Sequence, residues 1–224
     1  MIPLKDDLPT RSFPLITIGF IAANIAIFFY EVSLGPRSEK LILTYGAIPF
    51  DLTRGVLVGK EHIPVPVSLL TSMFLHGGLM HLAGNMLYLW IFGNNIEDVM
   101  GHLRFVFFYL LCGVAAVYAH AWVDPASVVP MIGASGAISG VLGAYLLLFP
   151  RAKVLTLIPI GFFVQIVRIP AVLVLGFWIV VQFLSGMFSA GRAGGVAWFA
   201  HVGGFIAGMA LIFFFKKKKS RRAG

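Results

Sequence analysis

The feature that most constrains this chain is a series of apolar runs, several of which are long enough to cross a lipid bilayer. The first lies at residues 13–33, and five more follow before residue 216. A helix needs about 20 predominantly apolar residues to cross the hydrocarbon core of a bilayer. Only 12% of the 224 residues are charged, about half the share that is usual in a soluble domain. The sequence therefore predicts an integral membrane protein with several spans.

We expect one all-α domain of six transmembrane helices at residues 13–215. It lies between a cytoplasmic N-terminal tail, residues 1–12, and a basic cytoplasmic C-terminal tail, residues 216–224. The polar connection after the first span, residues 34–68, is too long for a plain turn and should have structure of its own on the membrane surface. The spans predicted after the first are residues 70–92, 103–123, 135–149, 169–188 and 198–215.

Basic residues are distributed unevenly between the two sides of this predicted bundle. With the N-terminus in the cytoplasm, twelve Lys and Arg residues fall on the inner side and five on the outer side. The positive-inside rule therefore places both termini in the cytoplasm, and we expect a bacterial cytoplasmic (inner) membrane. The net charge of +8 does not indicate a nucleic-acid partner, because no basic patch with interleaved aromatic residues occurs. The lipid bilayer is the expected partner.

Two of the predicted spans begin with a polar residue among small ones. Ser135 opens the fourth span between Gly133 and Gly136, and His201 opens the sixth span ahead of Gly204. Small residues let membrane helices approach closely, which would bring the Ser135 hydroxyl and the His201 ring within hydrogen-bonding distance. A serine beside a general base is the arrangement of nucleophilic catalysis. Taken alone, each of the two residues also fits a purely structural role.

The second predicted span carries two further polar residues on one face. His81 and Asn85 are four residues apart, and as hydrogen-bond donors they would suit an oxyanion. Asn85 alone also fits a hydrogen bond between helices, and His76 is expected to bond loop backbone rather than join the catalytic set. No metal or other cofactor is expected, because no HExxH motif and no intramembrane carboxylate completes a zinc site. The single cysteine, Cys112, is expected to pack.

Together these motifs resemble those of the rhomboid intramembrane serine proteases, over nearly the whole chain. The Gly-x-Ser-Gly motif of that family is similar to residues 133–136, and its Ala-His-x-x-Gly motif is similar to residues 200–204. Its His-x-x-x-Asn motif is similar to His81 through Asn85, and a further family histidine resembles His76. Each motif is weak alone, but their order on these helices is highly specific.

The resemblance implies a catalytic dyad of Ser135 and His201 without a third member. It implies an oxyanion hole formed by His81, Asn85 and the backbone amide of Ser135. It also implies a six-helix bundle with a membrane-embedded loop between the first two spans. Members of the family cleave transmembrane segments of other proteins near the outer membrane surface, through an acyl-enzyme and without a cofactor.

The chain departs from the family pattern at two places. Residues 67–68 are Val-Ser where many members carry Trp-Arg, and Ser139 stands where an aromatic residue often stacks on the catalytic histidine. The second change leaves open how the ring of His201 is held. Glu97 and Gly101 do fit the family pattern and are expected to be structural.

The residues also leave open two functions other than proteolysis. One is a rhomboid-like protein that binds client helices without cutting them, and the other is a small transporter or channel. If the chain is a protease, water must reach the dyad through a cavity open to the outer side. The fifth span and the glycine-rich residues 186–195 are then expected to form a mobile gate.

Overall fold

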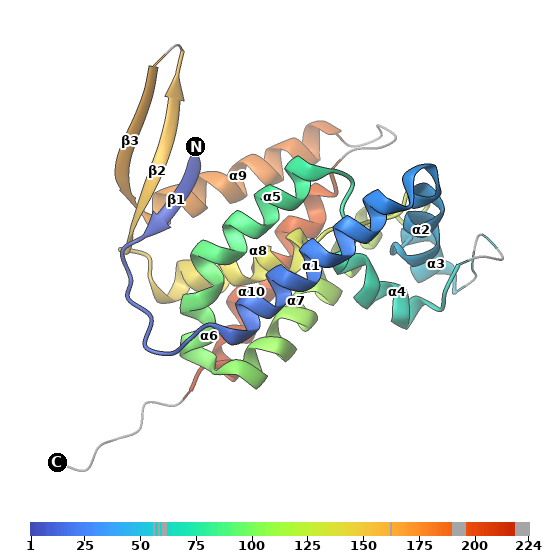
Figure 1. Ribbon diagram of the computed structural model, residues 1–224, viewed down its shortest axis with the longest axis horizontal. Helices are drawn as coiled ribbons and strands as arrows, with labels where there is room; N and C mark the ends of the chain where they lie inside the picture. Colours follow the sequence, from blue (N-terminus) through green and yellow to red (C-terminus); the bar gives the residue numbers. More distant parts are fainter. Residues whose placement is uncertain (56, 58, 60–61, 162, 190–195, 218–224) are drawn as a thin grey trace.

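The computed structural model describes residues 1–55, 57, 59, 62–161, 163–189 and 196–217. The chain is mostly helical, and its elements form one bundle with a small sheet at one end (Figure 1). The long helices are α1 (Leu15–Ser33), α7 (His102–Val123), α8 (Ser135–Leu148), α9 (Ala171–Ser189) and α10 (Trp198–Phe215). Their bounds agree closely with the predicted first, third, fourth, fifth and sixth spans.

The second predicted span is a series of short helices. They are α4 (Val65–Thr71), the 3-10 turn η2 (Ser72–Phe74), α5 (Leu79–Tyr88), the π turn η3 (Leu89–Gly93) and α6 (Asn94–Met100). The chain bends by 87° between Phe74 and Leu79, where His76 and two glycines interrupt the apolar run. The predicted span 70–92 is therefore broken near these glycines, and the part before the break is also helical.

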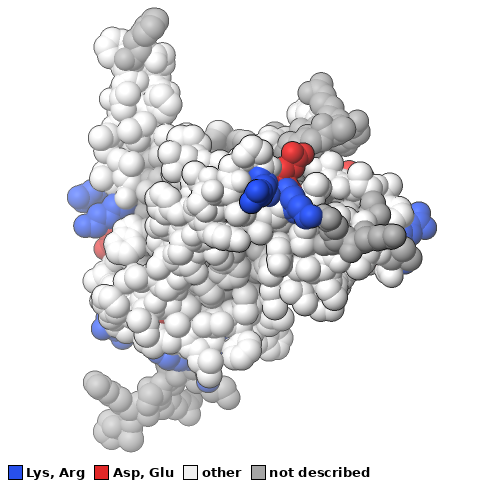
Figure 2. Space-filling view, turned by 45° about the vertical axis from the view of Figure 1, so that its right-hand side comes forward, with Lys and Arg blue, Asp and Glu red and all other residues white. Residues whose placement is uncertain are grey.

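Four helices among the described residues are long and apolar enough to cross a membrane, or five if the bent pair forms one span. Helix α8 has only 14 residues, which at 1.5 Å per residue is shorter than the hydrocarbon core. Figure 2 shows wide areas without Lys, Arg, Asp or Glu between separate groups of charged side chains. The chain is an integral membrane protein, and four or five of the six predicted spans are long enough to cross the bilayer among the described residues.

The prediction of an all-α protein was wrong at one end of the bundle. Strands β1 (Ile2–Asp6), β2 (Lys153–Ile160) and β3 (Phe163–Pro170) form an antiparallel sheet in the order β1-β2-β3. Residues 153–170 are rich in Val, Ile, Leu and Phe and have Gly161 near their centre, where φ is +60°. Such a composition favours a hairpin, which projects from the bundle in Figure 1.

The N-terminal segment is likewise more than a tail. Strand β1 pairs with β2, and the Asp6 carboxylate accepts hydrogen bonds from the Tyr145 hydroxyl (2.6 Å) and the Asn95 amide (2.7 Å). The long connection after α1 also has the structure expected of it. It contains the 3-10 turn η1 (Gly35–Arg37) and helices α2 (Ser38–Tyr45) and α3 (Pro49–Arg54).

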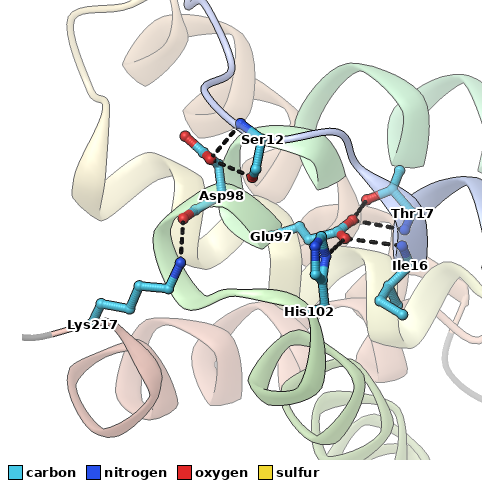
Figure 3. Close-up of polar contacts among 7 residues, drawn as sticks. All are labelled: Ser12, Ile16, Thr17, Glu97, Asp98, His102 and Lys217. Carbon is cyan, nitrogen blue, oxygen red and sulfur yellow. Dashed lines mark hydrogen bonds and ion pairs between the residues drawn. The ribbon is translucent and has the colours of Figure 1, made fainter.

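A buried carboxylate of α6 holds the start of α1 (Figure 3). Glu97 is 0% exposed and accepts hydrogen bonds from the backbone amides of Ile16 (2.9 Å) and Thr17 (2.8 Å), and from the Thr17 hydroxyl (2.7 Å). The His102 ring contacts the same carboxylate. First-turn amides have no partner inside their own helix, so Glu97 caps α1 from a distant part of the chain, in line with its expected structural role.

Helices α8 and α10 pack backbone to backbone near the middle of the bundle, with α1 and α5 in front of them in Figure 1. A Cβ added at Gly204 would overlap the carbonyl oxygen of Gly136, and one at Gly208 would overlap that of Gly140. Glycines at these positions are what permits the close approach. We call this contact the α8–α10 seam; it fixes the relation between the first turns of the two helices.

Candidate active site

The α8–α10 seam brings together the serine and the histidine that the sequence singled out. Ser135 is the first residue of α8, and its Oγ lies 2.8 Å from Nε2 of His201, in the first turn of α10. The His201 residue is 9% exposed, whereas Ser135 is half-buried. A hydroxyl within hydrogen-bonding distance of an imidazole is the arrangement required for proton transfer from nucleophile to base.

The segment ahead of Ser135 is held by backbone hydrogen bonds to two other parts of the chain. Ala47 and Met131 exchange a pair of bonds, and the Gly133 amide donates to the Ser72 carbonyl (2.9 Å). Gly133 has φ of +113°, a backbone conformation that residues with a Cβ rarely adopt. The glycine ahead of the serine is thus required by backbone geometry.

The second nitrogen of the histidine ring contacts a residue that the sequence analysis missed. Oε1 of Gln182, on α9, lies 2.7 Å from Nδ1 of His201. The Trp178 ring, also on α9, lies 5.8 Å from the His201 ring and is tilted by 36°. The Trp198 ring lies 6.3 Å from the His201 ring in an edge-to-face arrangement. These contacts answer the question raised by Ser139, whose hydroxyl instead donates to the Ser135 carbonyl (2.6 Å).

No motif indicates Gln182, which is not part of the glycine-flanked or helically spaced motifs that contain the other candidate residues. The available signal was broader: any polar side chain inside a span needs a partner there. In the sequence Gln182 stands inside an apolar run, between Val181 and Phe183. Its partner is 19 residues away, so the sequence alone did not indicate which side chain it would meet.

The two predicted oxyanion donors, His81 and Asn85, lie on α5 beside the segment that leads into Ser135. A Cβ built on Gly133 would be 2.7 Å from two atoms of the His81 ring and 3.5 Å from the Asn85 side-chain nitrogen. Both donors therefore border the backbone two residues before the serine. A side chain at Gly133 would displace the His81 ring.

His76, which the sequence analysis kept out of the catalytic set, adjoins these donors. Its Nε2 lies 3.0 Å from the Asn85 amide nitrogen, and its own backbone amide donates to the buried Glu31 carboxylate (3.3 Å). The His76 and His81 rings meet edge to face at 5.1 Å. His76 therefore does bond backbone, to the Phe74 carbonyl, but it also fixes the Asn85 amide.

A small cavity of about 30 Å³ lies beside Ser135, large enough for at least one water molecule. Its walls include Gly133, Gly136, Ala197 and Ala200. Within the described ranges, no group of three or more His, Cys, Asp or Glu side chains is placed to hold a metal ion. Of the loop predicted as part of a gate, residues 190–195 lie outside the described part of the chain.

Comparison with known proteins agrees with these motifs. The sequence model of the Rhomboid domain matches residues 65–218. The chain is 34% identical to the Rhomboid protease GluP of Bacillus subtilis (strain 168) over 199 residues, which are 88% of this chain and 35% of that protein. It is 36% identical to Rhomboid protein 1, mitochondrial, of Saccharomyces cerevisiae over 108 residues, 46% of this chain and 31% of that protein.

A third similar protein is the Rhomboid protease AarA of Providencia stuartii, 30% identical over 146 residues, which are 58% of this chain and 49% of that protein. The chain thus spans about a third to a half of the length of these relatives. The matched Rhomboid domain covers α4 through α10, including Ser135, His201, His81 and Asn85. Because this match covers more than half of its residues, the chain belongs to the rhomboid family.

Proposed function

We propose that this protein is an intramembrane serine endopeptidase that cleaves transmembrane segments of other membrane proteins. The observation that carries the proposal is the 2.8 Å separation of the Ser135 Oγ and the His201 Nε2, in a chain of the rhomboid family. Two of the bacterial relatives are named rhomboid proteases. The catalytic assignment of Ser135 and His201 rests on this geometry.

In the proposed mechanism, Nε2 of His201 takes the Ser135 proton as Oγ attacks the scissile carbonyl carbon. The carbonyl oxygen becomes an oxyanion, which accepts hydrogen bonds from the His81 ring, the Asn85 amide and the Ser135 backbone amide. His201 then returns its proton to the leaving amine, and the peptide C–N bond breaks to leave an acyl-enzyme. A water molecule, activated by His201 in turn, hydrolyses the ester and restores the serine.

The remaining assignments of the site follow from the same proposal. Gly133, Gly136 and Gly204 support the dyad, because a Cβ at these positions would overlap the His81 ring, Ala116 of α7 and the Gly136 carbonyl, respectively. The reaction needs no metal and no other cofactor, since the base, the nucleophile and the oxyanion donors are all side-chain or backbone groups.

For the membrane arrangement, we propose six spans, with the bent pair of helices as the second and the short α8 as the fourth. The rhomboid domain then occupies residues 13–215, between cytoplasmic segments 1–12 and 216–224. The excess of basic residues on the inner side supports cytoplasmic termini in a bacterial inner membrane. Ser135 then opens toward the outer side, where a substrate helix would enter past α9 and unwind locally before cleavage.

The test is labelling of the purified protein in liposomes with a fluorophosphonate probe, which reacts with activated serines. Wild type and Ser33→Ala, a control at an exposed position of α1, should both be labelled, whereas Ser135→Ala and His201→Ala should not. Folded wild-type protein that stays unlabelled would refute the proposal and favour a role in binding client helices without cutting them.

A further inference from the structure

Gln182 stands out as a buried polar side chain in a helix that is otherwise almost entirely apolar. Within α9 (Ala171–Ser189) its neighbours along the chain are Val180, Val181, Phe183 and Leu184. It is 7% exposed, although an amide removed from water is unfavourable unless it forms hydrogen bonds. The hydrogen bond that the structure records for it is to Nδ1 of His201, at 2.7 Å.

The atom that Gln182 presents decides which nitrogen of His201 carries the proton. A carbonyl oxygen only accepts, so the contact with Oε1 requires a hydrogen on Nδ1. The neutral ring then has a free lone pair on Nε2, which faces the Ser135 Oγ at 2.8 Å. The opposite tautomer would place a hydrogen on Nε2 and leave no acceptor for the serine proton.

We propose that Gln182 is a positioning residue that holds His201 in the tautomer and orientation needed to act as a base. The inference rests on the proposed Ser135–His201 chemistry. When His201 takes the serine proton the ring becomes positively charged, and a hydrogen bond to a charged donor is stronger than one to a neutral donor. Gln182 thus stabilises the protonated ring more than the resting one.

The location of Gln182 makes the base depend on the position of α9. Ser135 and His201 are joined through the α8–α10 seam, whereas Gln182 and Trp178 both come from α9. Many side chains of α9 are exposed, including Leu173, Phe177 and Phe183. A displacement of α9, such as the proposed entry of a substrate helix requires, would remove both contacts from the ring. The dyad is then fully competent only after α9 returns.

The experiment compares Gln182→Leu, which removes the acceptor at similar volume, with Gln182→Glu, which keeps an acceptor oxygen. Leu184→Ala, on an exposed part of the same helix, is the matched control. The readouts are the rate constant for fluorophosphonate labelling, and kcat and KM for a synthetic transmembrane peptide carrying a fluorophore and a quencher. Thermal unfolding of each variant in detergent monitors folding.

We expect Gln182→Leu to lower the labelling rate and kcat by about 10- to 100-fold, the usual effect of a hydrogen bond to a charged group, with KM unchanged. Gln182→Glu should recover most of that loss, and Leu184→Ala should react like wild type. If Gln182→Leu does not fold, Gln182→Met takes its place.

Two results would overturn the inference while leaving the proposed function intact. The first is wild-type labelling and kcat in a folded Gln182→Leu or Gln182→Met variant. The second is an equal loss in Gln182→Glu and Gln182→Leu, which would indicate that shape at this position matters and the acceptor does not. Failure of the proposed function is distinct from both, because wild type itself would then remain unlabelled.

Discussion

Substitution of Gly208 by alanine tests whether the α8–α10 seam sets the geometry of the dyad. A Cβ at this position would lie 2.5 Å from the Cα and the carbonyl carbon of Gly140, whereas ordinary contact begins at 3.4 Å. The helices would have to separate by about 1 Å to relieve this overlap. Since Ser135 and His201 are on opposite sides of the seam, their 2.8 Å contact lengthens as the helices part.

The expected losses follow from that displacement. A misplacement of about 1 Å typically lowers the rate about 100-fold, and overpacking of a closely packed contact destabilises by about 1–3 kcal/mol. Gly208 is two turns from His201, so the loss of rate would act through the packing of the helices rather than through contact with the ring. Gly208→Ala should therefore label about 100 times more slowly than wild type while remaining folded.

The assay is the time course of fluorophosphonate labelling in liposomes, with thermal unfolding measured on the same preparations. Gly176→Ala on α9 is the matched control, because nothing lies within 4 Å of a Cβ built there. That variant should label like wild type and be up to about 1 kcal/mol more stable, since alanine favours a helix. Equal labelling rates in Gly208→Ala and Gly176→Ala would refute the view that the seam positions the dyad.

Three further variants test other parts of the structure. Glu97→Ala should lower the free energy of unfolding by about 3 kcal/mol or more, because buried donors of α1 lose their acceptor; a stability equal to wild type in detergent unfolding would contradict the capping role. Burial raises the pKa of Asp6 despite its bond to Tyr145. The protonated Asp6 side chain therefore stabilises the fold below pH 3.8, and this stabilisation is lost as pH rises through the raised pKa. The free energy of unfolding of Asp6→Asn should therefore increase relative to that of wild type as pH rises. The same pH dependence of this free energy in both proteins would contradict the prediction. Asn85→Ala should slow labelling about 100-fold or more, and His76→Ala should slow it less; an unchanged rate in Asn85→Ala would exclude it from the oxyanion site.

The helices were predictable because length and apolarity are local properties of a span. Each of the five long helices begins and ends close to its predicted bounds, and both ends of α10 agree. The proximity of Ser135 and His201 was predictable for a related reason, since glycines at helical spacing indicate which faces of α8 and α10 can meet. His81 and Asn85 were placed on one face by their spacing alone.

The sheet and the histidine's second partner depend on contacts between distant segments. Strand β1 pairs with a hairpin about 150 residues further along, and the sequence of residues 153–170 was interpreted only as a connection between spans. Gln182 was missed because it belongs to none of the sequence motifs, and its partner lies on another helix. Neither the β1–β2 pairing nor the Gln182–His201 contact has a local sequence pattern, since each depends on how distant segments are arranged in space.

The closely packed seam does not include α9, and this has a consequence for how the surrounding lipid acts on the protein. Helices respond to a bilayer of different hydrophobic thickness by tilting. Helices α8 and α10 interlock through their backbones and must tilt as a unit, which preserves the distance between Ser135 and His201. Helix α9 can tilt against them, which changes the distance from Gln182 to His201. Acyl-chain length should therefore alter the rate of the reaction without altering the separation of the nucleophile and the base.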